Sequence, residues 1–230
     1  VSQKLLVAGN YQEAIAYLES ALAKEPDNKE YKSALADAKS RAFRISMNQV
    51  KKLLAQQEPG IQVLEQAESL LKKVANYPQG QQELQQQASI VSAAKEALIE
   101  KVRKVYAQAL VSVDAKDWIK ANFDLTKVQN LYPNFERTAP LLNKIKVEGV
   151  RDYLTQSKGQ FDDFDFNNAT ITARKALALD PSNRMATSFL KKIASSNSPA
   201  FFTELALKAS SKKDWAQVVF ACKKVLAMQR

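Results

Sequence analysis

The sequence contains no histidine, one cysteine, five glycines and seven prolines among its 230 residues. Histidine is the commonest general base and the commonest zinc ligand, so its absence argues against much enzyme chemistry and against most zinc sites. The single cysteine, Cys222, has no second thiol in this chain with which to form a disulfide. No run of about 18 apolar residues occurs, and the first residues show no signal-peptide pattern, so no segment is predicted to span a membrane.

What the sequence does contain favours helices. Ala, Leu, Lys, Gln and Glu dominate, and these residues have the most favourable helix propensities. Hydrophobic residues make up 46% of the chain and charged residues 25%, which is typical of a folded globular or repeat protein. The composition therefore predicts an all-α chain.

Positive charge is in excess, and it is concentrated near the carboxyl terminus. The formal net charge is +10, and residues 182–230 carry nine Lys or Arg against two acidic residues, which gives +7 for that segment. Such a basic segment either forms an ordinary solvated helix surface or attracts an acidic protein, a nucleic acid or an anionic surface.

A repeated helix hairpin is visible from residue 9 onwards. Residues 9–28 read GNYQEAIAYLESALAKEPDN. Gly9 and Asn10 suit a turn between two antiparallel helices, Tyr11 fills the space where the helices diverge, Ala14 lets a partner helix approach, and Pro26 ends the second helix. This pattern resembles the second half of a tetratricopeptide repeat (TPR). The resemblance implies antiparallel helix hairpins that stack into a right-handed solenoid.

The distance of 15 residues from Tyr11 to Pro26 can be carried along the chain. It places Val63, Trp118 and Phe166 in the aromatic position, and Trp215 takes this position in the last segment. The successive intervals are 52, 55, 48 and 49 residues, whereas a repeat of this family has about 34. The pattern predicts one solenoid over residues 1–230 with five units, at 1–28 (partial), 29–79, 80–134, 135–182 and 183–230.

The excess length of each unit is expected in its first helix. Residues 29–57 and 81–113 hold strong helix formers and no central break, so each predicts one long helix or two nearly continuous ones. In the last unit the excess is instead divided at residues 195–199, SSNSP, with Ser198 as a helix N-cap and Pro199 at the first helical position. Because the chain starts inside a hairpin, it is expected to be a fragment of a longer protein. Its compartment, cytoplasmic or periplasmic, would depend on upstream sequence.

Two tryptophans and the cysteine are predicted to be core residues. Trp118 and Trp215 both occupy the aromatic position, where core packing explains a large ring better than ligand stacking does. Cys222 lies seven residues after Trp215, in a position that Leu18 holds in the first unit, and is interpreted as a small buried hydrophobic residue.

Residues 159–170, GQFDDFDFNNAT, have the beginning of a calcium-binding pattern. Asp163, Asp165 and Asn167 match the spacing that opens an EF-hand loop, but the required Gly and Glu are replaced by Asn168 and Arg174. The preferred interpretation is a lengthened hairpin turn in which Phe166 is the repeat anchor and the aspartates lie near a helix N-terminus. No metal site and no cofactor are therefore predicted.

The resemblance implies a non-catalytic scaffold or adaptor that binds a protein or peptide within a larger assembly, and an acidic partner is one option. The general character of the sequence favours a bacterial source. The groove positions of the family correspond here to Asn48, Lys51, Arg103, Tyr106, Arg151 and Lys158. Two alternatives stay open. One is a basic module that binds nucleic acid or another polyanion through Lys191, Lys192, Lys212, Lys213, Lys223 and Lys224, and the other is a structural spacer or oligomerisation arm. The oligomeric state cannot be predicted from these features.

Overall fold

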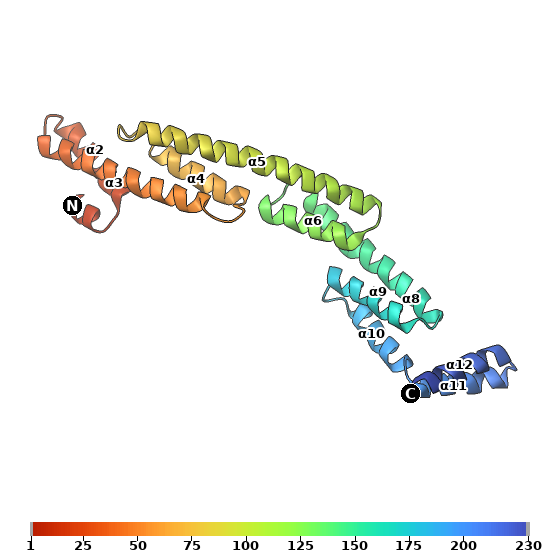
Figure 1. Ribbon diagram of the computed structural model, residues 1–230. Helices are drawn as coiled ribbons and strands as arrows, with labels where there is room; N and C mark the ends of the chain where they lie inside the picture. The colour runs from red at the N-terminus through yellow and green to blue at the C-terminus, as the bar shows by residue number, and fades with distance from the viewer. Residues whose placement is uncertain (1, 229–230) are drawn as a thin grey trace. The chain divides into compact units, whose positions relative to one another are not determined.

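The computed structural model describes residues 2–228, and within that range all regular secondary structure is helical (Figure 1). Val1, Gln229 and Arg230, the last of which was counted in the basic segment, lie outside the described residues. The helices are α1 (Ser2–Val7), α2 (Tyr11–Lys24), α3 (Lys29–Leu54), α4 (Ile61–Lys73), α5 (Gln81–Asp114), α6 (Trp118–Leu131), α7 (Thr138–Lys144), the π-helical turn η1 (Ile145–Gly149), α8 (Val150–Asp162), α9 (Phe166–Leu179), α10 (Arg184–Ser196), α11 (Pro199–Ser211) and α12 (Trp215–Met228).

Successive helices pair as antiparallel hairpins. Helix α1 packs on α2, α3 on α4, α8 on α9, and α11 on α12, while α2 also contacts α3 and α9 contacts α10 (Figure 1). This arrangement confirms the predicted all-α helical repeat. The chain divides into two compact units, one formed by the chain up to Val105 with Lys127–Phe135, the other by Tyr106–Thr126 with the chain from Glu136. The five-unit division remains a prediction.

The first helices of the hairpins are long, as predicted. Helix α3 has 26 residues and α5 has 34, each without a break. Helices α7 and α8 join through η1 into one continuous helical segment. The last unit is divided as expected, because the Ser198 side chain accepts a hydrogen bond from the backbone N–H of Phe201 at 3.3 Å and Pro199 begins α11. An N-cap hydroxyl satisfies one of the donors that a helix start leaves without an intrahelical partner.

Four hairpin turns share one backbone geometry. In each, the residue two positions before the aromatic anchor has a positive φ, and the next residue donates its N–H to a carbonyl five residues earlier, as in a Schellman motif. The positive-φ residues are Gly9, Lys116, Phe164 and Lys213. The corresponding hydrogen bonds run from Asn10 to Leu5, Asp117 to Ser112, Asp165 to Gln160, and Asp214 to Ala209, at 2.8–3.0 Å. The backbone N–H of this Asn or Asp thus satisfies a carbonyl at the end of the first helix, and the residue stands directly before the second helix.

The α3–α4 turn differs, and it shifts the second unit. Residues 55–60 separate the two helices, a longer connection than in the other four hairpins. The buried side of α4 consists of Ile61, Leu64, Ala67 and Leu71, whereas Val63 is half-buried. Because Ala67 supplies the small residue three positions after Leu64, the placement of the anchor at Val63 was wrong by one residue. The rule of 15 residues from anchor to proline misplaced this anchor because the α3–α4 turn is longer than the other four turns.

The aspartate-rich stretch forms the end of α8, a turn and the start of α9. Helix α8 continues to Asp162, so the turn spans residues 163–165 and is as short as the turn at residues 8–10. The prediction of a lengthened turn was therefore wrong. The ring of Phe166 lies 5.3 Å from that of Phe161, between centroids. The Asp165 carboxylate accepts a hydrogen bond from the Asn168 N–H at 3.2 Å, which makes Asp165 the N-cap of α9.

The two tryptophans have different environments. Trp118 is buried in the core formed by α5, α6, α8 and α9, as predicted. Trp215 is 62% exposed, and Cys222 is also exposed, so both predictions of burial were wrong. Both lie on the exposed side of α12, whereas other residues of α12 pack on α11.

Candidate partner-binding surfaces

The six residues predicted to bind a partner lie on first helices of three hairpins. Asn48 and Lys51 are on α3, Arg103 and Tyr106 on α5, and Arg151 and Lys158 on α8. Asn48, Lys51 and Arg103 belong to the first compact unit, and the other three belong to the second. The six are therefore described within their own units, and the claim that they form one groove remains a prediction.

Several of these side chains already have partners within the chain. The Lys51 ammonium lies 2.8 Å from the Glu83 carboxylate of α5. The Tyr106 hydroxyl accepts a hydrogen bond from the backbone N–H of Arg137 at 3.3 Å. Arg151 lies 3.7 Å from the carboxylate of its neighbour Asp152. Each of the three residues thus has an interaction within the chain, although the two ion pairs are exposed and contribute little to stability.

Lys158 has a different setting, since it lines a groove between α8 and α10. The groove has a volume of about 470 Å³. The lining residues are Leu154, Lys158, Arg184, Met185, Ser188, Phe189 and Lys192. Three of them are cationic and none is acidic. Leu154, Met185 and Phe189 supply apolar surface, and the Lys192 ammonium lies 4.8 Å from the centre of the Phe161 ring. We call this surface the α8–α10 groove.

The cations of the α8–α10 groove keep their charge available. Among the salt bridges of residues 2–228, none involves Lys158, Arg184 or Lys192. Arginine offers a planar fork of donors that suits carboxylates, and lysine supplies a mobile positive charge. Apolar side chains beside such cations suit a segment that alternates hydrophobic and acidic residues. This arrangement can hold an anionic peptide.

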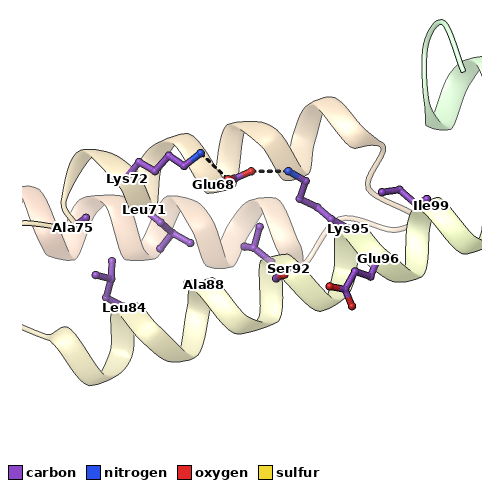
Figure 2. Close-up of a pocket in the computed structure, with 11 residues that line it drawn as sticks. Glu68, Leu71, Lys72, Ala75, Leu84, Ala88, Ser92, Lys95, Glu96 and Ile99 are labelled. Atoms are coloured by element: carbon purple, nitrogen blue, oxygen red, sulfur yellow. Dashed lines mark hydrogen bonds and ion pairs between the residues drawn. The ribbon is translucent and has the colours of Figure 1, made fainter.

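A second groove lies between α4 and α5 (Figure 2). It also has a volume of about 470 Å³, and Leu71, Leu84 and Val91 provide buried apolar surface. Figure 2 shows Glu68 on one rim, held between Lys72 and Lys95, at 2.7 and 2.6 Å. The hydrogen bonds from Lys72 and then Lys95, reinforced by their charges, lower the pKa of Glu68 to about 2. The hydrogen bond with Glu68 in turn raises the pKa of Lys95.

The rim of the α4–α5 groove is therefore electrostatically balanced. Its lining includes two lysines, Lys72 and Lys95, and two glutamates, Glu68 and Glu96, so the formal charges cancel and the rim offers no net charge to a ligand. The apolar floor could accommodate hydrophobic side chains, but the groove lacks the single-sign charge found between α8 and α10. The two grooves have similar volumes and different chemistry.

The lysines of the polyanion alternative are spread over three elements. Lys191 and Lys192 lie on α10, Lys212 and Lys213 at the end of α11 and in the next turn, and Lys223 and Lys224 on α12. The Lys224 ammonium lies 5.5 Å from the centre of the Phe220 ring. Hydrogen bonds from Asn168 lower the pKa of Asp165, and the positive charge of Lys224 adds to this shift. Lys192 is shared with the α8–α10 groove.

Sequence reasoning missed Arg184 and Met185 as candidate site residues. Both lie in the first turn of α10, the additional helix of the last unit, and Met185 is 69% exposed. A template built on 34-residue repeats has no position for this helix, so it assigns its residues no groove. The sequence signal was Asn183 as a helix N-cap, followed directly by Arg184 and Met185. In the structure the Asn183 side chain accepts a hydrogen bond from the Ala186 N–H at 3.0 Å.

The comparison with family models supports the repeat assignment. A family model described as a tetratricopeptide repeat matches residues 5–43. The crystal structure of the P58(IPK) TPR domain is similar over 98% of this chain and 70% of that chain, with 18% identity and a TM-score of 0.24. No curated protein matches the sequence. Tetratricopeptide repeats generally mediate protein–protein interactions and are typically non-catalytic. Residues 5–43 thus match a tetratricopeptide repeat, and the helix hairpins that follow continue the all-α helical repeat.

Proposed function

We propose that this chain is a non-catalytic interaction scaffold that binds an acidic segment of a partner protein in the α8–α10 groove. The observation that carries the proposal is the grouping of Lys158, Arg184 and Lys192 around an apolar surface with no acidic lining residue. A segment with carboxylates flanking one or two hydrophobic side chains would complement this groove in both charge and polarity.

A helical-repeat scaffold suits such a role. Stacked helix pairs present extended surfaces, and a bound segment can contact side chains from more than one helix. Here α8 contributes Leu154 and Lys158, and α10 contributes the remaining lining residues. Since α9 packs on both α8 and α10, these two helices are held by a common neighbour. The groove therefore needs little rearrangement to receive a ligand, which lowers the entropic cost of binding.

The test is a binding titration with two labelled peptides. Both have twelve residues with the same central Leu and Phe, but one carries four Glu and the other four Lys. Fluorescence anisotropy should show binding of the acidic peptide and at least tenfold weaker binding of the basic one. Lys158→Glu or Arg184→Glu should each weaken binding of the acidic peptide about tenfold, which corresponds to about 1.4 kcal/mol.

The matched control is Lys120→Glu, which makes the same charge change at an exposed position of α6 in the same compact unit. Its affinity for the acidic peptide should stay within about twofold of the unaltered chain, because only long-range electrostatics changes. Equal losses in all three variants would show that net charge, not the groove, attracts the peptide. That result would refute the proposal.

The polyanion alternative is distinguished by the same series. Nucleic-acid binding requires neutralisation of several phosphates and falls steeply with salt. A duplex of twenty base pairs titrated at 50 and 200 mM salt should bind weakly or not at all if the acidic-peptide proposal holds. Tight, strongly salt-dependent binding that is lost in Lys212→Glu and Lys213→Glu would favour the polyanion function instead.

A further inference from the structure

The outward side of α12 carries an unpaired apolar stripe. Its members are Trp215, Val219, Cys222 and Leu226, which we call the α12 stripe. Trp215 is 62% exposed, Val219 52% and Leu226 63%, and Cys222 is exposed between them. The spacing of 4, 3 and 4 residues places all four on one face of the helix. Exposed apolar side chains are common singly, but a continuous row of them marks an interaction surface.

The two middle positions of this row are buried in the first unit, and the two outer ones are half-buried. The anchor Tyr11 and the residues 4, 7 and 11 positions later are Tyr11, Ile15, Leu18 and Leu22. Ile15 and Leu18 are buried in a cluster with Ala38 and Ala42 of α3. Helix α3 thus packs directly on this row of α2.

The fourth unit repeats this arrangement. Phe166 and Ala173, at the anchor and seven positions after it, are buried in a cluster with Ile193 of α10, and Phe189 and Leu190 pack against them. Helix α10 therefore covers on α9 the row that is exposed on α12. In two units of this chain, a helix with an apolar side covers part of this row.

Charge indicates what kind of helix would fit α12. Lys212 and Lys213 flank the Trp215 end, and Lys223 lies four positions after Val219 and three before Leu226, beside the stripe. All three are exposed, and no salt bridge within the described residues involves them. Nearby, Asp214 accepts a hydrogen bond from the Gln217 N–H at 3.1 Å as part of the helix start. A second copy of α12 would bring like charges together, whereas acidic residues beside an apolar row would be complementary.

We infer that the α12 stripe binds an amphipathic helix of a partner protein whose apolar row is flanked by acidic residues. The helix lies along Trp215, Val219, Cys222 and Leu226 as α3 lies along α2, and its carboxylates face Lys212, Lys213 and Lys223. This surface is separate from the α8–α10 groove and does not depend on it. A scaffold with both surfaces would hold one partner as an acidic segment and another as a helix.

The test uses Cys222 as a built-in reporter, because it is the only cysteine of the chain and lies within the stripe. The probe is a synthetic 18-residue helix with Leu at four positions spaced 4, 3 and 4 apart and Glu on both flanks. A second peptide has Lys in place of every Glu. At a saturating concentration, the Glu peptide should slow maleimide alkylation of Cys222 at least tenfold and shift Trp215 emission to shorter wavelength.

Substitutions test whether the residues of the α12 stripe, and not exposed apolar side chains in general, bind the peptide. Val219→Asp and Leu226→Asp change exposed side chains, so folding should be retained, and each should weaken binding of the Glu peptide at least tenfold. Leu207→Asp is the matched control, since Leu207 is 69% exposed on the neighbouring α11 and lies outside the stripe. The Lys158→Glu variant should bind the helix peptide normally, which separates this proposal from the α8–α10 groove.

Three results would overturn the inference. The first is equal protection of Cys222 by the Glu and Lys peptides, and the second is unchanged binding by Val219→Asp. The third is a concentration-dependent dimer in sedimentation experiments that protects Cys222 without peptide and is abolished by Val219→Asp. That last outcome would assign the stripe to a second copy of the chain.

Discussion

Gly149 provides the sharpest test of the packing in the second unit. It is buried in η1, within the continuous helical segment of α7, η1 and α8. A Cβ added to Gly149 would meet Leu179 Cδ1 at 2.6 Å, Trp118 Cγ at 2.9 Å and Trp118 Cβ at 3.0 Å. Leu179 can yield at the end of its side chain. Trp118 cannot yield easily, because it is 4% exposed and enclosed by the core.

Two opposing effects decide the outcome of Gly149→Ala. Replacing a helical glycine with alanine normally stabilises by about 1 kcal/mol. Overpacking a dense core by one methyl group costs about 1–3 kcal/mol, because side chains must leave their preferred rotamers. The contacts with the Trp118 ring and Cβ place this site towards the upper end of that range. We therefore expect Gly149→Ala to lower the free energy of unfolding by about 1–2 kcal/mol.

The matched control lies ten residues later in the same helical segment. Gly159 is exposed in α8, and a Cβ there would meet nothing within 4 Å. Gly159→Ala should therefore stabilise the chain by about 0.5–1 kcal/mol through helix propensity alone. Urea denaturation followed by circular dichroism at 222 nm measures both variants, with the m-value compared as well as the midpoint. A Gly149→Ala variant as stable as the unaltered chain, alongside a stabilised Gly159→Ala, would refute the packing argument.

Three further predictions address the pH response, the acidic turn and the carboxyl-terminal core. Because the folded-state pKa of Glu68 is lowered from about 4.5 to about 2, its stabilisation is complete above pH 4.5 and is lost as the pH falls towards 2. Glu68→Gln should therefore lose less stability than the unaltered chain between pH 5 and pH 2.5 in urea titrations; identical losses would contradict the ion-pair assignment. Asp165→Ala should cost about 1 kcal/mol through loss of the α9 N-cap, while Asp163→Ala should change the urea midpoint little, and equal effects would argue against capping. Phe202→Ala removes a side chain with no exposed surface and should cost about 3–5 kcal/mol, seen as faster amide exchange in α11 and α12; unchanged exchange there would show that Phe202 does not hold this hairpin.

Much of the fold is encoded locally, and the hairpin turns show why. Asn10, Asp117, Asp165 and Asp214 each precede an aromatic residue, and the last three accept a hydrogen bond from the N–H three residues later. Such turn and capping chemistry involves only a few neighbouring residues, so it can be predicted from sequence. The same is true of Ser198 and Pro199, which mark the start of α11 correctly.

The candidate sites were less predictable, because they depend on helices far apart in the sequence. Lys158 was selected on family positions, but Arg184 joins it only because α8 and α10 pack on the same helix, α9. Likewise, the sequence predicts Lys51 as a cation available to a partner. In the structure its ammonium lies 2.8 Å from the Glu83 carboxylate of α5. Which charges are paired is a property of tertiary packing, since the partners need not be sequence neighbours.

The sequence by itself determined that this chain is helical, that its helices form hairpins with an aromatic anchor, and where most of those helices begin and end. Helix propensity, capping and turn geometry act within a few residues, so they can be inferred from sequence. Only the tertiary structure decided which anchors are buried. Trp118 and Trp215 occupy the same repeat position, yet the first is enclosed by neighbouring helices and the second is open to solvent. The burial of a helix face depends on what packs against it, and that is not encoded in the face itself.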